Sequence, residues 1–430
     1  MPTSLQGIAK KASQLGKRRF GNLYEMLNEE FLLECWRDIN KDAAYGVDEM
    51  SAREYEENLE ENIRDLVGRL KRKSYRAKLV RRHYIPKGDG RMRPLGIPAV
   101  EDKLVQLAVA RILEAIYEPE FLRCSYGYRP RIGARDAVDK LTIKLQFGRY
   151  NYVVEADIKG FFDHIDHDWM MRMLGERIED GALLRLIQKW LKAGVLDTDG
   201  EVIHPVTGTP QGGIVSPILA NVYLHYVLDL WFEKVVKRRG RGEACVIRYA
   251  DDFVCAFEHR QDAEGFYRAL GERLRKFGLE LAEDKTRIIA FEQHQSQTRF
   301  EFLGFEFRWG IDRSGKPHLK RRTARSKLRK SLANFTQWCQ ENRNLRLRKL
   351  FEQLSLKLRG HYNYYGVSGN YGGLKEFHGQ AVRILWKWLN RRSQRRSFNW
   401  RGFQELMVHF QLPRPRIMVR TRTRLAASLA

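Results

Sequence analysis

Apolar residues early in the chain recur at helical spacing. After Ser51, apolar side chains appear every three or four residues, at Tyr55, Leu59, Ile63, Leu66 and Leu70. This spacing predicts an amphipathic helix. Ser51-Ala-Arg-Glu54 is a capping box, which predicts that the helix begins there. Residues 1–45 also indicate helices, behind a basic lead-in.

The next apolar segments have the pattern of strands. Two extended pieces within 84–98, joined by Gly88-Asp-Gly90, predict a hairpin. A helix follows over 101–117, and residues 152–157 predict a strand that ends on the acid Asp157. Residues 245–257 predict two apolar half-strands on either side of Tyr249-Ala-Asp251-Asp252.

Helices dominate the rest of the chain. The other expected elements are a helix from Ser216, with Pro217 at its first position, to about Val236, a helix over 262–277 ended by Gly278, strands near 286–291 and 299–309, and helices near 323–340, 344–359 and 374–397. The order predicts an α+β core with helical additions at both ends.

Charge is distributed unevenly along the 430 residues. The net charge is +25, but residues 321–430 hold 25 basic and four acidic residues, so +21 lies in the last quarter. This asymmetry predicts a polyanionic partner, nucleic acid first and an acidic membrane surface second. Hydrophobic residues make up 43% of the chain, which excludes wholesale disorder.

The cysteines and the apolar segments indicate a reducing compartment. Five cysteines without a C-x-x-C spacing argue against a disulfide framework or a zinc module. The first 20 residues contain no apolar stretch typical of a secretory signal, and no run of about 18 apolar residues occurs. We therefore expect a cytoplasmic protein that does not span a membrane.

Paired carboxylates between apolar strands need a physical reason. Asp251 and Asp252 are neighbours at the expected turn, and Asp157 ends another apolar strand. Neighbouring negative charges beside a core repel, and a divalent cation removes that repulsion. The three acids could hold two Mg²⁺ ions. The alternatives are an ordinary Asp-containing turn at 251–252 and a helix cap at Asp157.

An ordered series of segments resembles one enzyme family. Tyr249-Ala-Asp251-Asp252 resembles the YxDD box of reverse transcriptases, in the YADD form of group II intron-encoded enzymes. Other segments resemble, in order, the N-terminal extension (Tyr45-Gly-Val-Asp48), the first fingers motif (85–98), motif A (157–162), motif B (208–217), motif D (279–286), the primer grip (Phe302-Leu-Gly-Phe305) and the thumb-to-maturase (domain X) region (359–365). The resemblance covers about residues 40–420.

The resemblance implies a right-hand polymerase with an antiparallel palm sheet and a C-terminal helical domain. The implied domains are an N-terminal extension with the start of the fingers (1–80), the fingers (81–150), a palm with inserted fingers and palm helices (151–310), and a basic helical thumb and maturase domain (311–430). The implied activity is RNA-directed DNA synthesis, a nucleotidyl transfer, in the palm.

The resemblance also implies residue roles. The implied roles are two Mg²⁺ ions on Asp157, Asp251 and Asp252, a general acid at Lys285, triphosphate contacts from Lys87 and Arg93, a steric gate against the 2′-hydroxyl at Phe162, a nucleotide or template contact at Gln211, and a primer grip at Phe302, Leu303 and Gly304. Several of these residues could instead have ordinary structural roles. The cations could be solvated, and the phenylalanines could be core residues.

The basic C-terminal segment would supply an RNA-binding surface. Arg391, Arg392, Arg395 and Arg396 are candidate phosphate contacts, since cations that neutralise phosphates release counterions. Trp386, Trp388 and Trp400 lie near them in sequence, and we expect these rings in the core rather than stacked on bases.

Three functions fit the sequence. The first is the reverse transcriptase of a group II intron, a mobile element, which uses an RNA template, a DNA primer and deoxynucleoside triphosphates and also aids splicing of the intron RNA. The second is a domesticated relative in DNA repair or phage defence. The third is an RNA-binding splicing chaperone with an idle polymerase site. No HNH endonuclease motif follows the domain X segment, so target-strand cleavage would come from elsewhere or be bypassed. The oligomeric state stays open.

Overall fold

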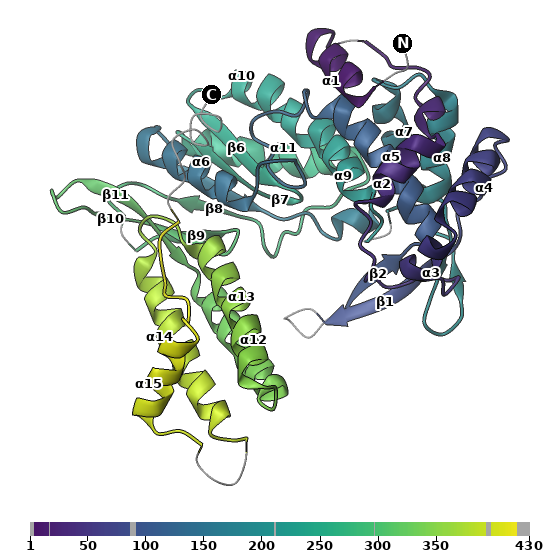
Figure 1. The fold of residues 1–430 in the computed structure, drawn as a ribbon. Coiled ribbons are helices and arrows are strands. Elements are labelled where there is room, and N and C mark those ends of the chain that lie inside the picture. The colour runs from purple at the N-terminus through teal and green to yellow at the C-terminus, as the bar shows by residue number, and fades with distance from the viewer. Residues whose placement is uncertain are drawn as a thin grey trace. The chain divides into compact units, whose positions relative to one another are not determined.

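The chain folds into two compact units that are each built from helices and small sheets. The computed structural model describes residues 4–16, 18–86, 92–209, 212–295, 297–392 and 397–418. The first unit comprises Met1–Gly133 with Val154–Ile288, and the second comprises Ala134–Val153 with Ile289–Ala430. Figure 1 follows the chain from purple to yellow. Antiparallel strand pairs beside helices confirm the predicted α+β class.

Helices form most of the first unit. They are α1 (Leu5–Gln14), η1 (Tyr24–Met26), α2 (Glu29–Trp36), α3 (Ala52–Glu57), α4 (Leu59–Lys71), α5 (Val100–Tyr117), η2 (Phe161–Asp163), α7 (His167–Gly175), α8 (Gly181–Leu191), α9 (Ser216–Leu224), η3 (His225–Asp229), η4 (Phe232–Val236), α10 (Lys237–Arg239) and α11 (Arg260–Lys276). The capping box at Ser51 and Glu54 is present as predicted. The helix breaks at Asn58, where the backbone leaves the helical region and a second helix, α4, begins.

Two four-stranded sheets accompany these helices. One has the order β2-β1-β4-β5, from β1 (Val80–Pro86), β2 (Met92–Ile97), β4 (Val195–Leu196) and β5 (Val202–Ile203). The other has the order β6-β7-β3-β8, from β3 (Tyr152–Ala156), β6 (Ala244–Tyr249), β7 (Asp252–Phe257) and β8 (Arg287–Ala290). The β1–β2 pair is the predicted hairpin, and its strands are antiparallel.

The helix that follows Ser216 departs from the prediction. The sequence predicts one helix to about Val236, but π-helical turns interrupt it at His225–Asp229 and Phe232–Val236. Each π turn accommodates an extra residue and so changes which side chains share a face. The apolar pattern alone could not distinguish this helix from a regular one, since almost every position of α9 is buried.

The second unit combines a three-stranded sheet with helices. Its elements are α6 (Ala134–Phe147), β9 (Arg299–Phe302), β10 (Phe305–Ile311), β11 (Pro317–Thr323), α12 (Arg325–Asn342), α13 (Leu347–Tyr365), α14 (Tyr371–Leu389) and α15 (Trp400–His409). The sheet order is β11-β10-β9, and α14 packs against α12 and α13 around buried residues such as Phe335 and Phe377 (Figure 1).

Two features of the second unit differ from the sequence expectations. Residues 317–323 form a strand that pairs with β10, so the all-helical segment begins only at Arg325. Helix α6 lies within this unit, although the sequence grouped it with the fingers. Side-chain bonds to β11 hold it there: Gln146 bonds to Pro317 O (3.2 Å) and Leu319 N (2.8 Å), and Asp139 pairs with Arg321.

Candidate active site

The turn between β6 and β7 presents the YADD box. Tyr249 pairs with Asp252, so Ala250 and Asp251 form a two-residue turn. Ala250 has a φ of +57°, in the left-handed region. That conformation costs a residue with a Cβ about 1–2 kcal/mol. The turn therefore needs outside support to stay in place.

Asp157 and Lys285 are brought together by the backbone. Asp157 directly follows β3, and the chain beyond it runs beside residues 280–282. Ile158 bridges to Leu281, and Ala282 N donates to Asp157 O at 2.8 Å. This pairing positions Lys285, whose Nζ lies 2.7 Å from Asp157 Oδ2. The predicted motif A and motif D residues thus form an ion pair.

Asp251 lies within the electrostatic reach of Asp157 and Arg93. Burial raises the pKa of the Asp251 carboxyl, and the negative charge of Asp157 raises it further. Arg93 of β2 acts in the opposite sense and lowers that pKa. Two acids and a cation that are far apart in sequence therefore influence one another across a single site.

Asp252 is more exposed than Asp251. It is the first residue of β7, and its side chain is exposed. Across the described ranges, no three His, Cys, Asp or Glu side chains gather closely enough to hold a metal ion. Asp157 lies close enough to Asp251 to raise the pKa of its carboxyl. The metal-binding roles of Asp157, Asp251 and Asp252 all stay predictions.

Phe162 lies beside the motif B segment. In η2, Phe161 is buried and Phe162 is half-buried, with their ring centroids 5.3 Å apart. Thr209 N donates to Phe162 O at 2.8 Å, and Gly208 N donates to Ile165 O at 2.7 Å. The less buried ring is thus the second of the pair, Phe162, at the position where the resemblance implies the steric gate.

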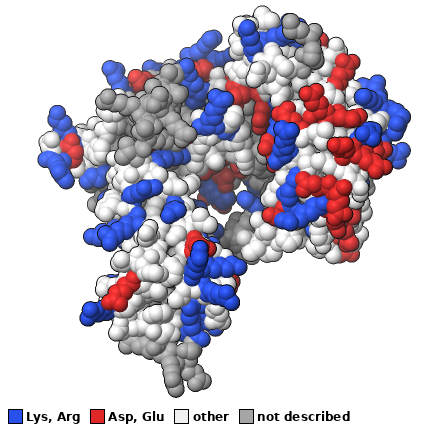
Figure 2. Space-filling view, viewed as in Figure 1, with Lys and Arg blue, Asp and Glu red and all other residues white. Residues whose placement is uncertain are grey.

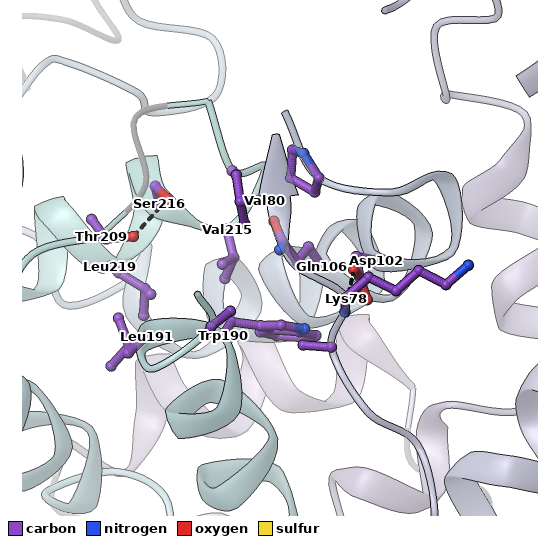
Figure 3. Close-up of a pocket in the computed structure, with 14 residues that line it drawn as sticks. Lys78, Val80, Asp102, Gln106, Trp190, Leu191, Thr209, Val215, Ser216 and Leu219 are labelled. Atoms are coloured by element: carbon purple, nitrogen blue, oxygen red, sulfur yellow. Dashed lines mark hydrogen bonds between the residues drawn. The ribbon is translucent and has the colours of Figure 1, made fainter. Parts of the chain in front are cut away.

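The motif B segment lines a small cavity of the first unit with Thr209, Gly213, Val215 and Ser216 (Figure 3). Ile214 N donates to Gln106 Oε1 at 2.9 Å, and the hydroxyls of Thr209 and Ser216 lie 2.8 Å apart. These bonds fix both sides of the segment that carries Gln211. Gln211 itself, like Lys87 of the fingers hairpin, lies outside the described residues.

Gly212 gives this segment a testable steric requirement. Its φ is +121°, and a Cβ there would lie 2.5 Å from Gly96 O of β2. We expect Gly212→Ala to lower the free energy of unfolding by about 1–3 kcal/mol in urea denaturation, because backbone strain and a backbone clash combine. Gly200→Ala is the matched control, since Gly200 also has a positive φ (+90°) but open space around its Cβ. Equal losses in the two variants would contradict the clash.

The predicted primer grip is a tight turn of the second unit. Leu303 and Gly304 connect β9 to β10, and both have positive φ values of 49° and 78°. Tyr364 donates its hydroxyl to Leu303 O at 3.0 Å. Phe302 is buried, so its ring serves the packing of this unit, whereas Leu303 and Gly304 are partly exposed.

The predicted arginine cluster is only partly described. Arg391 lies over the ring of Trp388, and Arg392 donates to Leu345 O at 2.7 Å. Arg392 is therefore partly engaged in holding its own unit together. Arg395 and Arg396 lie outside the described residues. Of the nearby tryptophans, Trp386 and Trp388 pack on the helical core as expected, and Trp400 is 43% exposed.

A second basic surface of the C-terminal unit was missed from the sequence. A cavity of about 540 Å³ lies between β10–β11 and the beginnings of α12 and α14. Six cations line it: Arg308, Lys320, Arg321, Arg322, Arg325 and Arg329. Figure 2 shows few acidic side chains over the helices of this unit, in contrast to the N-terminal helices. We call these six residues the basic cavity.

Three residues around the YADD turn were also missed. Tyr128 lies within electrostatic reach of Asp251 and Arg93, and burial followed by the Asp251 charge raises the pKa of its hydroxyl. A Cβ on Gly127 would lie 2.3 Å from Ala250 N. Arg248 is fully buried beneath the turn. A buried cation within the apolar run Val246-Ile-Arg-Tyr is the signal that could have found this residue.

Two general expectations can be compared with the structure. All five cysteines are free thiols. In the part of the chain that the structure describes, no helix is long and apolar enough to cross a membrane. The cytoplasmic location itself stays a prediction.

Comparison with known proteins identifies the family. The family model described as "Reverse transcriptase (RNA-dependent DNA polymerase)" matches residues 85–307. The group II intron-encoded protein LtrA of Lactococcus lactis subsp. cremoris is 33% identical over 402 residues, covering 74% of this chain and 65% of LtrA. Protein YkfC of Escherichia coli is 37% identical over 204 residues, covering 40% of this chain and 53% of YkfC. The chain thus spans less than two thirds of the length of these relatives.

A solved structure of telomerase from Candida albicans aligns with 79% of this chain and 64% of its own, at 14% identity and a TM-score of 0.45. The family-model match covers half of the chain and includes the YADD box, motifs A, B and D and the primer grip. The resemblance seen in the sequence is therefore confirmed. The chain belongs to the reverse transcriptase family and is similar within it to group II intron-encoded proteins.

Proposed function

We propose that the chain extends a DNA primer on an RNA template and that its palm site performs the nucleotidyl transfer. The observation that carries this proposal is the ion pair of Asp157 with Lys285 at 2.7 Å, beside an Asp251 carboxyl whose pKa is raised by burial and by Asp157 and lowered by Arg93. Two carboxylates beside an exposed cation suit a nucleoside triphosphate and the divalent metal that accompanies it. The antiparallel strand pairs and the helical C-terminal unit agree with a right-hand polymerase.

The donor set at this site fits Mg²⁺. Carboxylate oxygens are hard ligands, and Mg²⁺ is usually bound by one or two carboxylates together with substrate phosphates. The raised pKa of Asp251 reflects a buried negative charge that a cation would offset. Asp157 and Asp251 would hold the metal, with Asp252 as a third candidate. Bound Mg²⁺ would neutralise the charge that develops on the reacting oxygens.

The chain's own residues then bind and select the nucleotide. Arg93, exposed on β2 and close enough to act on Asp251, would hold the triphosphate, assisted by Lys87. The half-buried ring of Phe162 would exclude a 2′-hydroxyl by its bulk. Lys285 would donate a proton to the leaving pyrophosphate after it parts from Asp157. Gln211 would contact the nucleotide or the template.

The RNA partner would bind the basic C-terminal unit. The basic cavity supports this, because cations that face phosphates supply most of the affinity for nucleic acid. An accessory role in binding and splicing intron RNA follows from the same surface and from the similarity to intron-encoded proteins.

Primer extension tests the proposed function directly. We expect the purified chain to extend a DNA primer on an RNA template with Mg²⁺ and deoxynucleoside triphosphates, and to stop when EDTA removes the metal. Renewed extension after excess Mg²⁺ is the control for irreversible damage. Tight RNA binding without any extension would contradict the polymerase and favour the splicing chaperone.

A further inference from the structure

Arg248 and Asp229 form a buried ion pair under the YADD turn. Both side chains are completely inaccessible to solvent. Arg248 Nε lies 2.8 Å from Asp229 Oδ1, and Nη2 lies 2.6 Å from Oδ2, so the pair is bidentate. Taking two charges out of water is costly, and such pairs are often no more stabilising than apolar residues. Stability alone therefore does not explain why the pair is here.

Every remaining donor of the guanidinium is used. Nη1 donates to Asn221 Oδ1 and to Ala250 O, both at 3.0 Å. Nη2 also donates to Ser125 Oγ at 2.7 Å. Together with the two bonds to Asp229, these account for all five N–H groups of an arginine. One of the five acceptors, Ala250 O, belongs to the turn itself.

The same network also supports the turn through Gly127, on a second side. Asn221, which accepts from Arg248, donates its Nδ2 to Gly127 O at 2.7 Å. Gly127 is packed against the Ala250 backbone so closely that a Cβ would not fit. The strand β6 is held too, since Arg248 N donates to Cys124 O at 2.7 Å and Tyr126 N donates to Arg248 O at 2.8 Å.

A π-helical turn places the carboxylate for this network. Asn221 and Asp229 are eight residues apart, which in a regular α-helix would set them about 80° apart around the axis. The π turn at His225–Asp229 accommodates one extra residue, which brings the two side chains to within about 20°. Both side chains can then bond to Arg248. The buried ion pair therefore depends on the π turn in this helix.

We propose that Arg248 is a positioning residue that holds the strained Ala250 turn and thereby aims the Asp251 carboxylate. This inference rests on the proposed function, because it assumes that Asp251 acts in nucleotidyl transfer. Arg248 is buried under the turn, and its side chain acts on Asp251 through the backbone of the turn, at Ala250 O. Removing it should leave substrate binding intact and slow the chemical step.

Two variants separate positioning from folding. Arg248→Lys keeps a cation beside Asp229 but loses the planar fork that reaches Ala250 O. The double variant Arg248→Met with Asp229→Leu removes both buried charges, which is often neutral for stability, and also removes the bond to Ala250. Arg177→Lys is the matched control, because Arg177 is also buried in the first unit and paired with Glu120, and is not part of the network at the turn.

The readout is single-turnover primer extension, in which the amplitude reports the active fraction and the rate constant reports the chemistry. We expect wild-type amplitude with a rate constant about 10- to 100-fold lower for both Arg248 variants, and a higher Mg²⁺ requirement. Arg177→Lys should keep the wild-type rate constant. If the Arg248 variants lose amplitude but keep the rate constant, Arg248 is only structural and the proposal fails. Wild-type protein without extension would instead overturn the proposed function.

Discussion

Replacing Asp251 by asparagine is expected to reduce primer extension by about 10³-fold or more. The substitution keeps the size of the side chain and removes its charge. The position is half-buried, and the charge of Asp157 raises the pKa of the carboxyl there. Metal-assisted stabilisation of developing charge contributes several kcal/mol to a reaction barrier, and each 1.36 kcal/mol changes the rate about tenfold. The measurement is the single-turnover rate constant on an RNA template with saturating Mg²⁺.

Its controls separate chemistry from folding and binding. Glu272→Gln removes an exposed acid from α11 of the same unit and should keep the wild-type rate. Filter binding should give Asp251→Asn the same affinity for the template–primer as the wild type, since the change does not remove a cation. A rate constant for Asp251→Asn above one tenth of the wild-type value would contradict a catalytic role for this carboxylate.

Local sequence signals predicted the parts of the site that depend on local structure. The turn at Ala250 and Asp251 follows from two apolar half-strands around a polar pair, and the capping box at Ser51 begins a helix as expected. The grouping of Asp157 with Asp251 was predicted from acids at the ends of apolar strands and from the family resemblance, and not from the spacing between the two residues. Such a contact depends on which strands become neighbours, and periodicity within one strand carries no such information.

Other features could not be predicted from the sequence, because they depend on contacts with residues elsewhere in the chain. Asp229 lies in an almost wholly apolar segment, where a register shift by a π turn leaves no trace in the hydrophobic pattern. Helix α6 is amphipathic whichever unit it joins, and its place depends on bonds to β11 from side chains such as Gln146 and Asp139. The basic cavity is lined by residues of β10, β11, α12 and α14. The sequence shows how many cations these segments contain, but not that their side chains lie around one cavity.

RNA affinity is expected to fall steeply with salt and to depend on the basic cavity. A protein that neutralises 6–10 phosphates loses about 10³- to 10⁵-fold in affinity between 50 and 200 mM salt. Within the cavity, Arg321 pairs with Asp139 and Arg322 with Glu306, so those two cations are partly committed to the fold. Arg325 and Arg329 lie one helical turn apart on α12 and are exposed.

Arg325→Gln with Arg329→Gln should therefore weaken RNA binding by about 25- to 60-fold at 0.1 M salt and reduce the salt slope by about 1.4–1.8, as expected for two lost phosphate contacts. Arg348→Gln with Arg401→Gln is the matched control, since both arginines are exposed on helices of the same unit and pair with Glu352 and Glu405. Both doubles change the net charge equally, so a general electrostatic attraction would weaken binding equally. Only a local contact at the basic cavity makes the first double weaker than the second, and equal slopes would assign the RNA surface elsewhere.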